Sequence, residues 1–270
     1  MSLQASPARV MGIVNVTPDS FSDGGRLISL DAAVDHALRL VKQGADILDI
    51  GGESTRPGAE PVAAEAEIAR VVPLVERIRA RWDGRISIDT MKPEVVRAAV
   101  AAGATIWNDV TALSHAPDSL STAAELGCEV VLMHMKGEPR TMQDDPRYGD
   151  VVPEVAAFLA ARAEAAVEAG VACERIWLDP GLGFGKTAAH NLELTRRLDE
   201  IAALGFPVLY GVSRKRTIQA VDPTATDPLD RLGGSLALAL EAARRGAAVI
   251  RAHDVRETVQ ALKLQAAVGD

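Results

Sequence analysis

The chain has 270 residues, a formal net charge of -8, 48% hydrophobic residues and only 3% aromatic residues. This length suits one large domain or two small ones. The acidic balance argues against a general nucleic-acid or anionic-membrane surface, but it is compatible with a local cationic pocket for an anionic substrate.

Cysteine content and apolar runs exclude two further classes. Cys128 and Cys173 are too few for a disulfide framework or a multi-thiolate metal site, so we expect both to be structural thiols in a reducing compartment. No apolar run approaches the roughly 20 residues that span a bilayer. The first residues lack the basic start and apolar core of a secretory signal, and we therefore expect a soluble, cytoplasmic protein.

Short apolar runs alternate along the chain with longer, Ala-rich stretches of helical pattern. The apolar runs are nearly continuous and rich in β-branched residues, which is typical of strands buried on both faces. The eight predicted strands are Val10–Val14, Ile47–Ile50, Ile86–Ile88, Thr105–Trp107, Val130–Met133, Ile176–Leu178, Val208–Tyr210 and Ala248–Ile250. The eight predicted helices are Asp31–Gln43, Ala63–Arg81, Pro93–Ala102, Ser119–Leu126, Glu154–Ala169, Asn191–Leu204, Leu229–Arg245 and Val255–Leu264.

Glycines support these helix boundaries. Six of them directly follow a predicted helix or its apolar pattern, where a C-terminal cap is expected: Gly44, Gly103, Gly127, Gly170, Gly205 and Gly246. The segment 137–150 is polar, carries two prolines and two glycines, and is the most loop-like part of the chain.

Eight alternating βα units predict a single-domain (β/α)8 barrel over residues 1–270, with residues 1–9 as an N-terminal extension. The alternative is a doubly wound open sheet. That fold more often carries a glycine-rich dinucleotide turn after its first strand, whereas here the first strand runs into Asn15-Val16-Thr17-Pro18-Asp19.

Polar residues follow every predicted strand, at the barrel end where active sites form. Asp89, Asn108 and Asp179 are short, directional groups that could bind a flat heterocycle with adjacent N–H donors, and Lys215 and Arg251 add cations. Ordinary solvated loops remain the alternative for any single loop, but all eight together indicate a site.

Two other types of site are disfavoured. The segment Gly181–Thr187 ends in Gly-Lys-Thr, but Pro180 occupies the place of the first P-loop glycine. His134 and His253 each end a strand, yet no Cys/His cluster has zinc spacing. A lone oxygen ligand such as Asn15, completed by substrate phosphates and water, would instead suit Mg²⁺.

Two long motifs resemble the signatures of the dihydropteroate synthase family. They are Asn15-Val16-Thr17-Pro18-Asp19-Ser20-Phe21-Ser22-Asp23-Gly24-Gly25 and Asp49-Ile50-Gly51-Gly52-Glu53-Ser54-Thr55-Arg56-Pro57-Gly58. Shorter motifs follow in the family's order: Ile88-Asp89-Thr90, Asn108-Asp109, Asp179-Pro180-Gly181, Gly183-Phe184-Gly185-Lys186, Ser213-Arg214-Lys215 and Arg251-Ala252-His253-Asp254-Val255. The resemblance implies condensation of 7,8-dihydropterin-6-ylmethyl diphosphate with 4-aminobenzoate to 7,8-dihydropteroate and diphosphate, by dissociative substitution.

The resemblance also implies roles for individual residues. The pterin would be held by Asp89, Asn108, Met133, Asp179, Lys215 and Arg251. The diphosphate would be met by Asn15, Thr55, Arg56, Arg251 and His253, with Mg²⁺ bridging it to Asn15. The 4-aminobenzoate pocket would comprise Phe21, Pro57, Phe184, Gly211 and Ser213. The catalytic set would be Asp89, Lys215, Arg251 and His253.

Two other functions remain as alternatives. A corrinoid-dependent methyltransferase of the same pterin-binding superfamily would share the Asp/Asn pocket but would need neither the diphosphate loop nor the aminobenzoate site. A catalytically inactive pterin-binding protein would not need to retain all of Asn15, Arg56, Asp89, Lys215 and His253. A homodimer formed through barrel helices is expected by analogy with the family, with no nucleic-acid or membrane partner.

Overall fold

Eight parallel strands close into one barrel, with β1 paired to β8. The structure is a computed structural model that describes residues 8–16, 30–54, 60–137 and 141–268. The strands are β1 (Arg9–Asn15), β2 (Ile47–Gly51), β3 (Arg85–Asp89), β4 (Ile106–Asp109), β5 (Glu129–Met133), β6 (Ile176–Asp179), β7 (Val208–Gly211) and β8 (Ala247–Ala252). The predicted barrel is confirmed, and the open doubly wound sheet is wrong.

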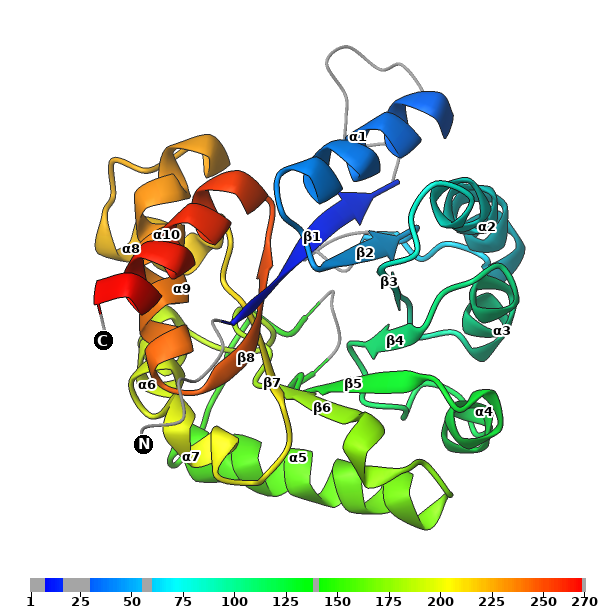
Figure 1. Cartoon of the computed structure of the whole chain (residues 1–270). Coiled ribbons are helices and arrows are strands. Elements are labelled where there is room, and N and C mark those ends of the chain that lie inside the picture. Colours follow the sequence, from blue (N-terminus) through cyan, green and yellow to red (C-terminus); the bar gives the residue numbers. More distant parts are fainter. Residues whose placement is uncertain (1–7, 17–29, 55–59, 138–140, 269–270) are drawn as a thin grey trace, which may run out of the picture.

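Helices surround the barrel in chain order (Figure 1). They are α1 (Leu30–Lys42), α2 (Ala64–Arg79), α3 (Pro93–Ala101), α4 (Ser119–Leu126), α5 (Val151–Glu168), α6 (Ala188–Arg196), α7 (Leu198–Ala202), α8 (Arg216–Val221), α9 (Leu232–Arg244) and α10 (Val255–Val268). Two 3₁₀ turns, η1 (Cys173–Arg175) and η2 (Pro228–Arg231), complete the described elements. All six glycines predicted as helix caps have positive φ angles, between 57° and 116°.

Two predicted helices differ from the structure. The helix predicted over Asn191–Leu204 is broken into α6 and α7 at Arg197, whose backbone leaves the helical region (φ −117°, ψ 31°) while its guanidinium binds Asp150 and Glu200. The helix predicted over Leu229–Arg245 begins as a 3₁₀ turn. There the buried Arg231 donates to the carbonyls of Ala225, Thr226 and Arg214, which holds the chain in a tighter turn. The short helix α8 was not predicted.

The strands carry two separate apolar layers. Side chains that face outward pack under the helices, as Leu48 and Ile50 of β2 do. Side chains that face inward fill the barrel: Met11, Ile47, Ile106, Val131, Trp177, Leu209 and Val249. Since successive strand residues alternate between the two faces, the residue two positions after each inward apolar side chain also points inward, one layer nearer the carboxyl end.

Candidate functional site

This alternation assembles a polar layer above the apolar interior. The residues two places after the inward apolar ones are Ile13, Asp49, Asn108, Met133, Asp179, Gly211 and Arg251. In register with this layer, Asp89 of β3 pairs with Asn108 and with Gly51, and Gly51 pairs with Asn15. Seven of the predicted site residues are therefore the last or next-to-last residues of the strands themselves, which fixes them more firmly than loops would.

Arg251 connects three strands across this layer. Its Nε donates to Asp49 Oδ2 at 2.6 Å, and its Nη2 donates to Asp89 Oδ2 at 2.8 Å. Its side chain keeps 22% exposure, against 15% for Asp89 and none for Asp49. Because a guanidinium has five N–H groups, some remain free to donate to a ligand after the hydrogen bonds to both carboxylates are made.

Asp49 also binds the amide of Asn108. Asn108 Nδ2 lies 3.3 and 3.4 Å from the two carboxylate oxygens of Asp49, and both side chains are buried. Asp49 was quoted in a motif but not predicted as a site residue. A carboxylate inside the otherwise apolar strand Ile47–Ile50 was the signal that could have identified it.

Lys215 and Asp179 lie on the other side of the layer. Lys215 Nζ donates to the carbonyl of Leu182 and lies 5.0 Å from the centre of the Phe184 ring. Asp179 accepts a hydrogen bond of 2.7 Å from the backbone N–H of Gly181. The structure therefore joins the residues predicted for the pterin to Phe184, predicted for 4-aminobenzoate, through one loop.

Burial and mutual charge shift the pKa values of this cluster. Burial raises the pKa of Asp89 to about 7 even though Arg251 opposes the shift, and burial also raises the pKa of Asp179. Burial lowers the pKa of Lys215 to about 8, against the attraction of Asp179. For Arg251, burial disfavours the charge, but Asp49 and Asp89 outweigh it and raise the pKa above its ordinary value. Perturbed groups of this density are typical of functional sites.

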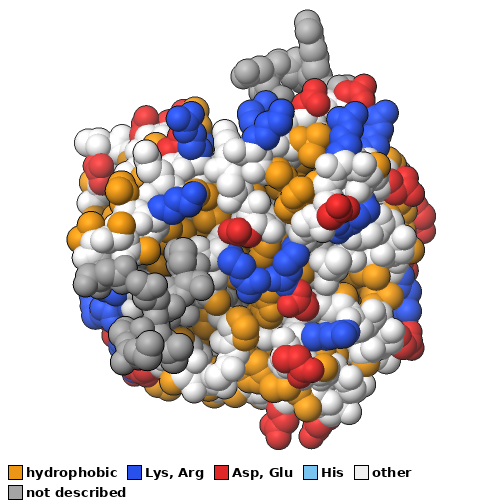
Figure 2. All heavy atoms as spheres, viewed as in Figure 1, with side chains coloured by type: hydrophobic (Ala, Val, Ile, Leu, Met, Phe, Trp, Pro, Cys, Tyr) orange, Lys and Arg blue, Asp and Glu red, His pale blue; other side chains and the backbone are white. Residues whose placement is uncertain are grey.

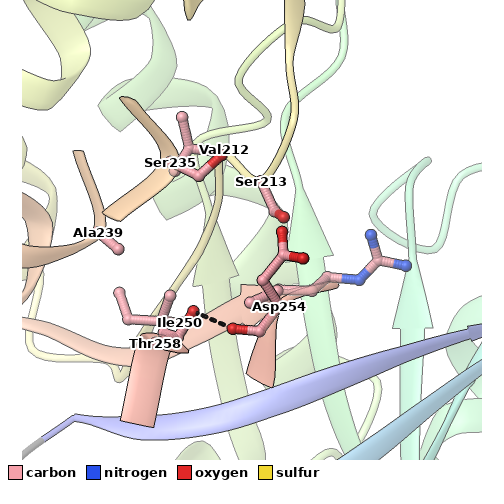
Figure 3. A pocket seen from close by; sticks show the side chains of 9 residues that line it. Val212, Ser213, Ser235, Ala239, Ile250, Asp254 and Thr258 are labelled. Carbon is pink, nitrogen blue, oxygen red and sulfur yellow. Dashed lines mark hydrogen bonds between the residues drawn. The ribbon is translucent and has the colours of Figure 1, made fainter. Parts of the chain in front are cut away.

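His253 lies between β8 and the end of β7. Its Nδ1 is 3.0 Å from Ser213 Oγ, and its backbone N–H donates to the same oxygen at 3.1 Å. The neighbouring Arg214 has a φ of 60° and binds Asp254 through Nε (3.0 Å) and Nη2 (2.5 Å), which ties the two loops together. Figure 3 shows Ser213 and Asp254 pointing toward one another beside a small cavity.

That cavity is too small to hold a substrate. Apolar side chains of β8, α9 and Val212, just after β7, line part of it, and Thr258 donates to the backbone carbonyl of Asp254 at 2.7 Å (Figure 3). We therefore take it as a packing gap behind the polar layer.

Lys186 is a second residue that the sequence did not assign. Its buried Nζ lies within hydrogen-bond distance of Gly181 O (2.9 Å), Phe184 O (3.0 Å), His134 O (3.1 Å) and His134 Nδ1 (2.8 Å). Burial lowers its pKa to about 7. Lys186 thus fixes the loop that carries Phe184. Its engagement with the protein agrees with the rejection of a P-loop here.

A buried ion cluster lies beside the end of β2. Lys92 Nζ binds Glu53 Oε2 at 2.5 Å and Glu67 Oε2 at 2.6 Å, and Glu53 also accepts from the backbone N–H of Val62 at 2.9 Å. These contacts fix residues on both sides of segment 55–59. The predicted site residues Phe21, Thr55, Arg56 and Pro57 lie outside the described residues.

The remaining predicted residues have identifiable places. Asn15 Oδ1 lies 3.5 Å from the position that a Cβ on Gly51 would take. Gly211 lies beside Arg251, whose Cβ is 3.9 Å from the equivalent position on Gly211, so a side chain there would face the arginine. Met133 is buried at the end of β5 and reaches within 3.1 Å of the position of a Cβ on Gly181.

The surface has no dominant charge of either sign in the view of Figure 2. Acidic and basic side chains alternate around the rim of that face, and basic side chains gather near its centre. Among the described residues, no group of three or more His, Cys, Asp and Glu could hold a metal ion. No helix in the described parts of the chain has the length and apolarity to cross a membrane.

Comparisons with known proteins agree with this geometry. The family model described as pterin binding enzyme matches residues 11–253. The chain is 50% identical to the dihydropteroate synthase of Escherichia coli strain K12, covering 97% of this chain and 92% of that relative.

Two solved structures from Xanthomonas albilineans are similar in fold as well. Its dihydropteroate synthase with 4-aminobenzoic acid is 52% identical, with a TM-score of 0.92 over 97% of this chain and 93% of that one. The same enzyme with 7,8-dihydropteroate is 49% identical, with a TM-score of 0.88 over 97% and 94% of the two chains.

Proposed function

The chain belongs to the pterin-binding enzyme family, as a dihydropteroate synthase, and from this premise we propose how its residues carry out the reaction. The enzyme joins 7,8-dihydropterin-6-ylmethyl diphosphate to 4-aminobenzoate. The observation that carries the residue assignment is the polar layer in which Arg251 contacts Asp49 and Asp89 at the carboxyl ends of the strands.

The pterin is recognised by complementary hydrogen bonds. Asp179 and Asn108 face the same layer, where a carboxylate can accept two parallel N–H bonds from a guanidine-like edge and the amide can offer an acceptor. Lys215 supplies a donor for a ring carbonyl or nitrogen. Met133 gives an apolar surface for the ring, and Arg251 can stack on it.

The leaving group requires a neutralised charge. Breaking the bond between the methylene carbon and the diphosphate oxygen sends the electron pair to diphosphate and leaves a carbocation delocalised into the dihydropterin. Arg251 and His253, with Thr55 and Arg56 from outside the described residues, meet the diphosphate. Asp89 stabilises the developing positive charge, because it is the carboxylate that binds Arg251 and is also partly exposed at the carboxyl end of the barrel.

Mg²⁺ fits one position. Asn15 offers a side-chain oxygen at the end of β1 beside Gly51, which has no side chain to obstruct it. Mg²⁺ prefers oxygen ligands, keeps several waters and binds through substrate phosphates, so it can be held by a single protein ligand. Such a site needs no cluster of carboxylates, and none occurs among the described residues. When bound there, the ion would neutralise part of the diphosphate charge.

The second substrate attacks the exposed carbon. The amine nitrogen of 4-aminobenzoate forms the new C–N bond and loses a proton, so the enzyme needs no covalent nucleophile. Phe184 lies beside Lys215, Ser213 beside His253 and Gly211 beside Arg251. These three residues are assigned to the 4-aminobenzoate ring, together with Phe21 and Pro57, which lie outside the described residues. The two alternative functions are disfavoured, because relatives matching nearly the whole chain at about half identity are synthases.

Assembly and location belong to the same proposal. We infer one domain over residues 1–270, acting as a homodimer. Four strongly exposed apolar side chains of the described chain lie on or between α8 and α10: Val221, Leu229, Leu264 and Val268. The exposed free thiol of Cys173 favours the reducing cytoplasm. Sedimentation equilibrium tests the dimer, and a single monomeric species would contradict it.

Diphosphate release tests the function. Purified protein with Mg²⁺ and both substrates should release diphosphate and form 7,8-dihydropteroate in equal amount, and no 7,8-dihydropteroate should form without 4-aminobenzoate. Arg56→Ala should raise the KM for the pterin diphosphate, and an unchanged KM would remove Arg56 from the diphosphate site.

A further inference from the structure

Asp49 is the most enclosed charged group of the barrel interior that the proposed mechanism does not use. It lies in the middle of β2, between the inward Ile47 below and Gly51 above, and its side chain has no exposure to solvent. Its register partner on β3 is Ser87. A buried carboxylate is costly unless it is paired, so its retention in this strand requires compensating donors.

Those donors are two residues proposed to contact the pterin. Arg251 on β8 donates through Nε at 2.6 Å, and Asn108 on β4 donates through Nδ2 at 3.3 Å. Asp49 therefore connects two strands that are not neighbours of β2 in the barrel.

The hydrogen bond to Asp49 fixes which way the Asn108 amide is oriented. An ionised carboxylate only accepts hydrogen bonds, so the amide of Asn108 must point its NH₂ group toward Asp49. Its oxygen is then turned away from Asp49, and the residue presents an acceptor to a ligand rather than a donor. The side-chain oxygen of Asn108 therefore selects a ligand that offers an N–H group.

We propose that Asp49 is a positioning residue for pterin recognition: it holds the Arg251 guanidinium and fixes the acceptor orientation of Asn108, without touching the substrate. This inference rests on the proposed function, because it takes Arg251 and Asn108 as pterin contacts.

Asp49 and Asp89 bind different nitrogens of Arg251 and have different roles. Asp89 is partly exposed and borders the opening, so a substrate or its developing positive charge competes with Arg251 for this carboxylate. Asp49 is sealed from solvent and keeps its bond to Nε throughout. Arg251 therefore stays in place when Asp89 turns to the substrate.

The test compares Asp49→Asn with wild type and with Ser87→Ala. Asparagine keeps the shape of Asp49 but offers an NH₂ group as well as an oxygen, so it no longer dictates the amide orientation of Asn108. Ser87→Ala is the matched control, because Ser87 is the buried register partner of Asp49 and its hydroxyl has no hydrogen-bond partner among the described residues.

In Asp49→Asn, kcat/KM for the pterin diphosphate should fall roughly tenfold to a hundredfold, as expected for loss of charged hydrogen bonds. The KM for 4-aminobenzoate should change less than about twofold, because Asp49 makes no hydrogen bond to Phe184, Gly211 or Ser213, the described residues of that pocket. Ser87→Ala should match wild type in both constants. Equal losses for both substrates, or an unchanged kcat/KM for the pterin substrate, would overturn the proposal.

Calorimetric binding of a 6-substituted pterin without diphosphate separates this inference from the proposed function, because it requires no turnover. The dissociation constant of this pterin should rise in Asp49→Asn. In the double variant that carries both Asp49→Asn and Asn108→Ala, the fold-increase should be smaller than the product of the fold-increases in the two single variants. Independent losses would contradict an action through Asn108. If Asp49→Asn does not fold, Asp49→Ser repeats the comparison with a smaller side chain.

Discussion

Arg251 and Asp89 form an ion pair of 2.8 Å that joins β8 to β3 at the mouth of the barrel. Asp89 is thereby both the partner of the principal cation and the carboxylate that borders the proposed reacting carbon. Asp49 holds the same arginine from below, so removing the charge of Asp89 leaves Arg251 anchored.

Asp89→Asn should therefore lower kcat by roughly a hundredfold, through loss of electrostatic stabilisation of the developing cation. Pterin affinity should fall much less, since the amide retains one acceptor. Steady-state kinetics and calorimetric titration measure the two effects. Equal losses in kcat and affinity would make Asp89 a binding group only.

His134 makes stability depend on pH. Burial and the Lys186 ammonium lower the pKa of His134 from 6.5 to about 3. Between these values the unfolded chain binds a proton that the folded chain does not, so the free energy of unfolding falls as the pH falls below 6.5. The titration of His134 should lower the free energy of unfolding by about 1 kcal/mol when the pH falls from 7.5 to 5.5.

His134→Gln keeps an acceptor for Lys186 but does not titrate. Urea unfolding at the two pH values should show a smaller difference for this variant than for wild type. His115→Gln, at an exposed histidine, controls for replacing a histidine by glutamine as such. An equal pH dependence in His134→Gln and wild type would contradict the assignment.

Lys92 should be a strong determinant of stability. Lys92→Met leaves Glu53 and the fully buried Glu67 without their cation, and breaking such a buried pair costs about 3–5 kcal/mol. Arg77→Met breaks an exposed ion pair with Asp31 and should cost less than about 1 kcal/mol. Denaturant unfolding measures both, and similar losses would show that the Lys92 cluster is not a buried network.

Two glycines should respond to alanine in opposite ways. Gly181 has a φ of 66°, and a Cβ there would lie 1.9 Å from the carbonyl oxygen of His134, so Gly181→Ala should destabilise the protein and disturb the loop that carries Phe184. Gly233 lies in α9 with nothing within 4 Å of its Cβ position, so Gly233→Ala should raise the free energy of unfolding by about 0.5–1 kcal/mol. Thermal unfolding compares the two variants, and a stable Gly181→Ala protein would show that the backbone there can relax.

The sequence predicted the barrel because hydrophobic runs and helical patterns alternated in eight successive units, six of which also ended their helix with a cap glycine. The break at Arg197 and the 3₁₀ start of α9 were missed, because both depend on arginines that bind residues distant along the chain.

The site was predictable where polar residues end strands, as at Asp89, Asn108 and Asp179. Asp49 and Lys186 were missed as site residues for a different reason. Their roles come from contacts across the barrel and within a folded loop, to Arg251 and to the carbonyls of Gly181 and Phe184. The one local signal was the carboxylate of Asp49 inside an otherwise apolar strand.

The most direct measurement is diphosphate release by the purified protein with Mg²⁺ and 7,8-dihydropterin-6-ylmethyl diphosphate, with and without 4-aminobenzoate. With 4-aminobenzoate present, the account predicts diphosphate release with 7,8-dihydropteroate formed in equal amount, and no 7,8-dihydropteroate without it. A folded protein that binds the pterin substrate yet releases no diphosphate, or that releases it without forming 7,8-dihydropteroate, would contradict the account.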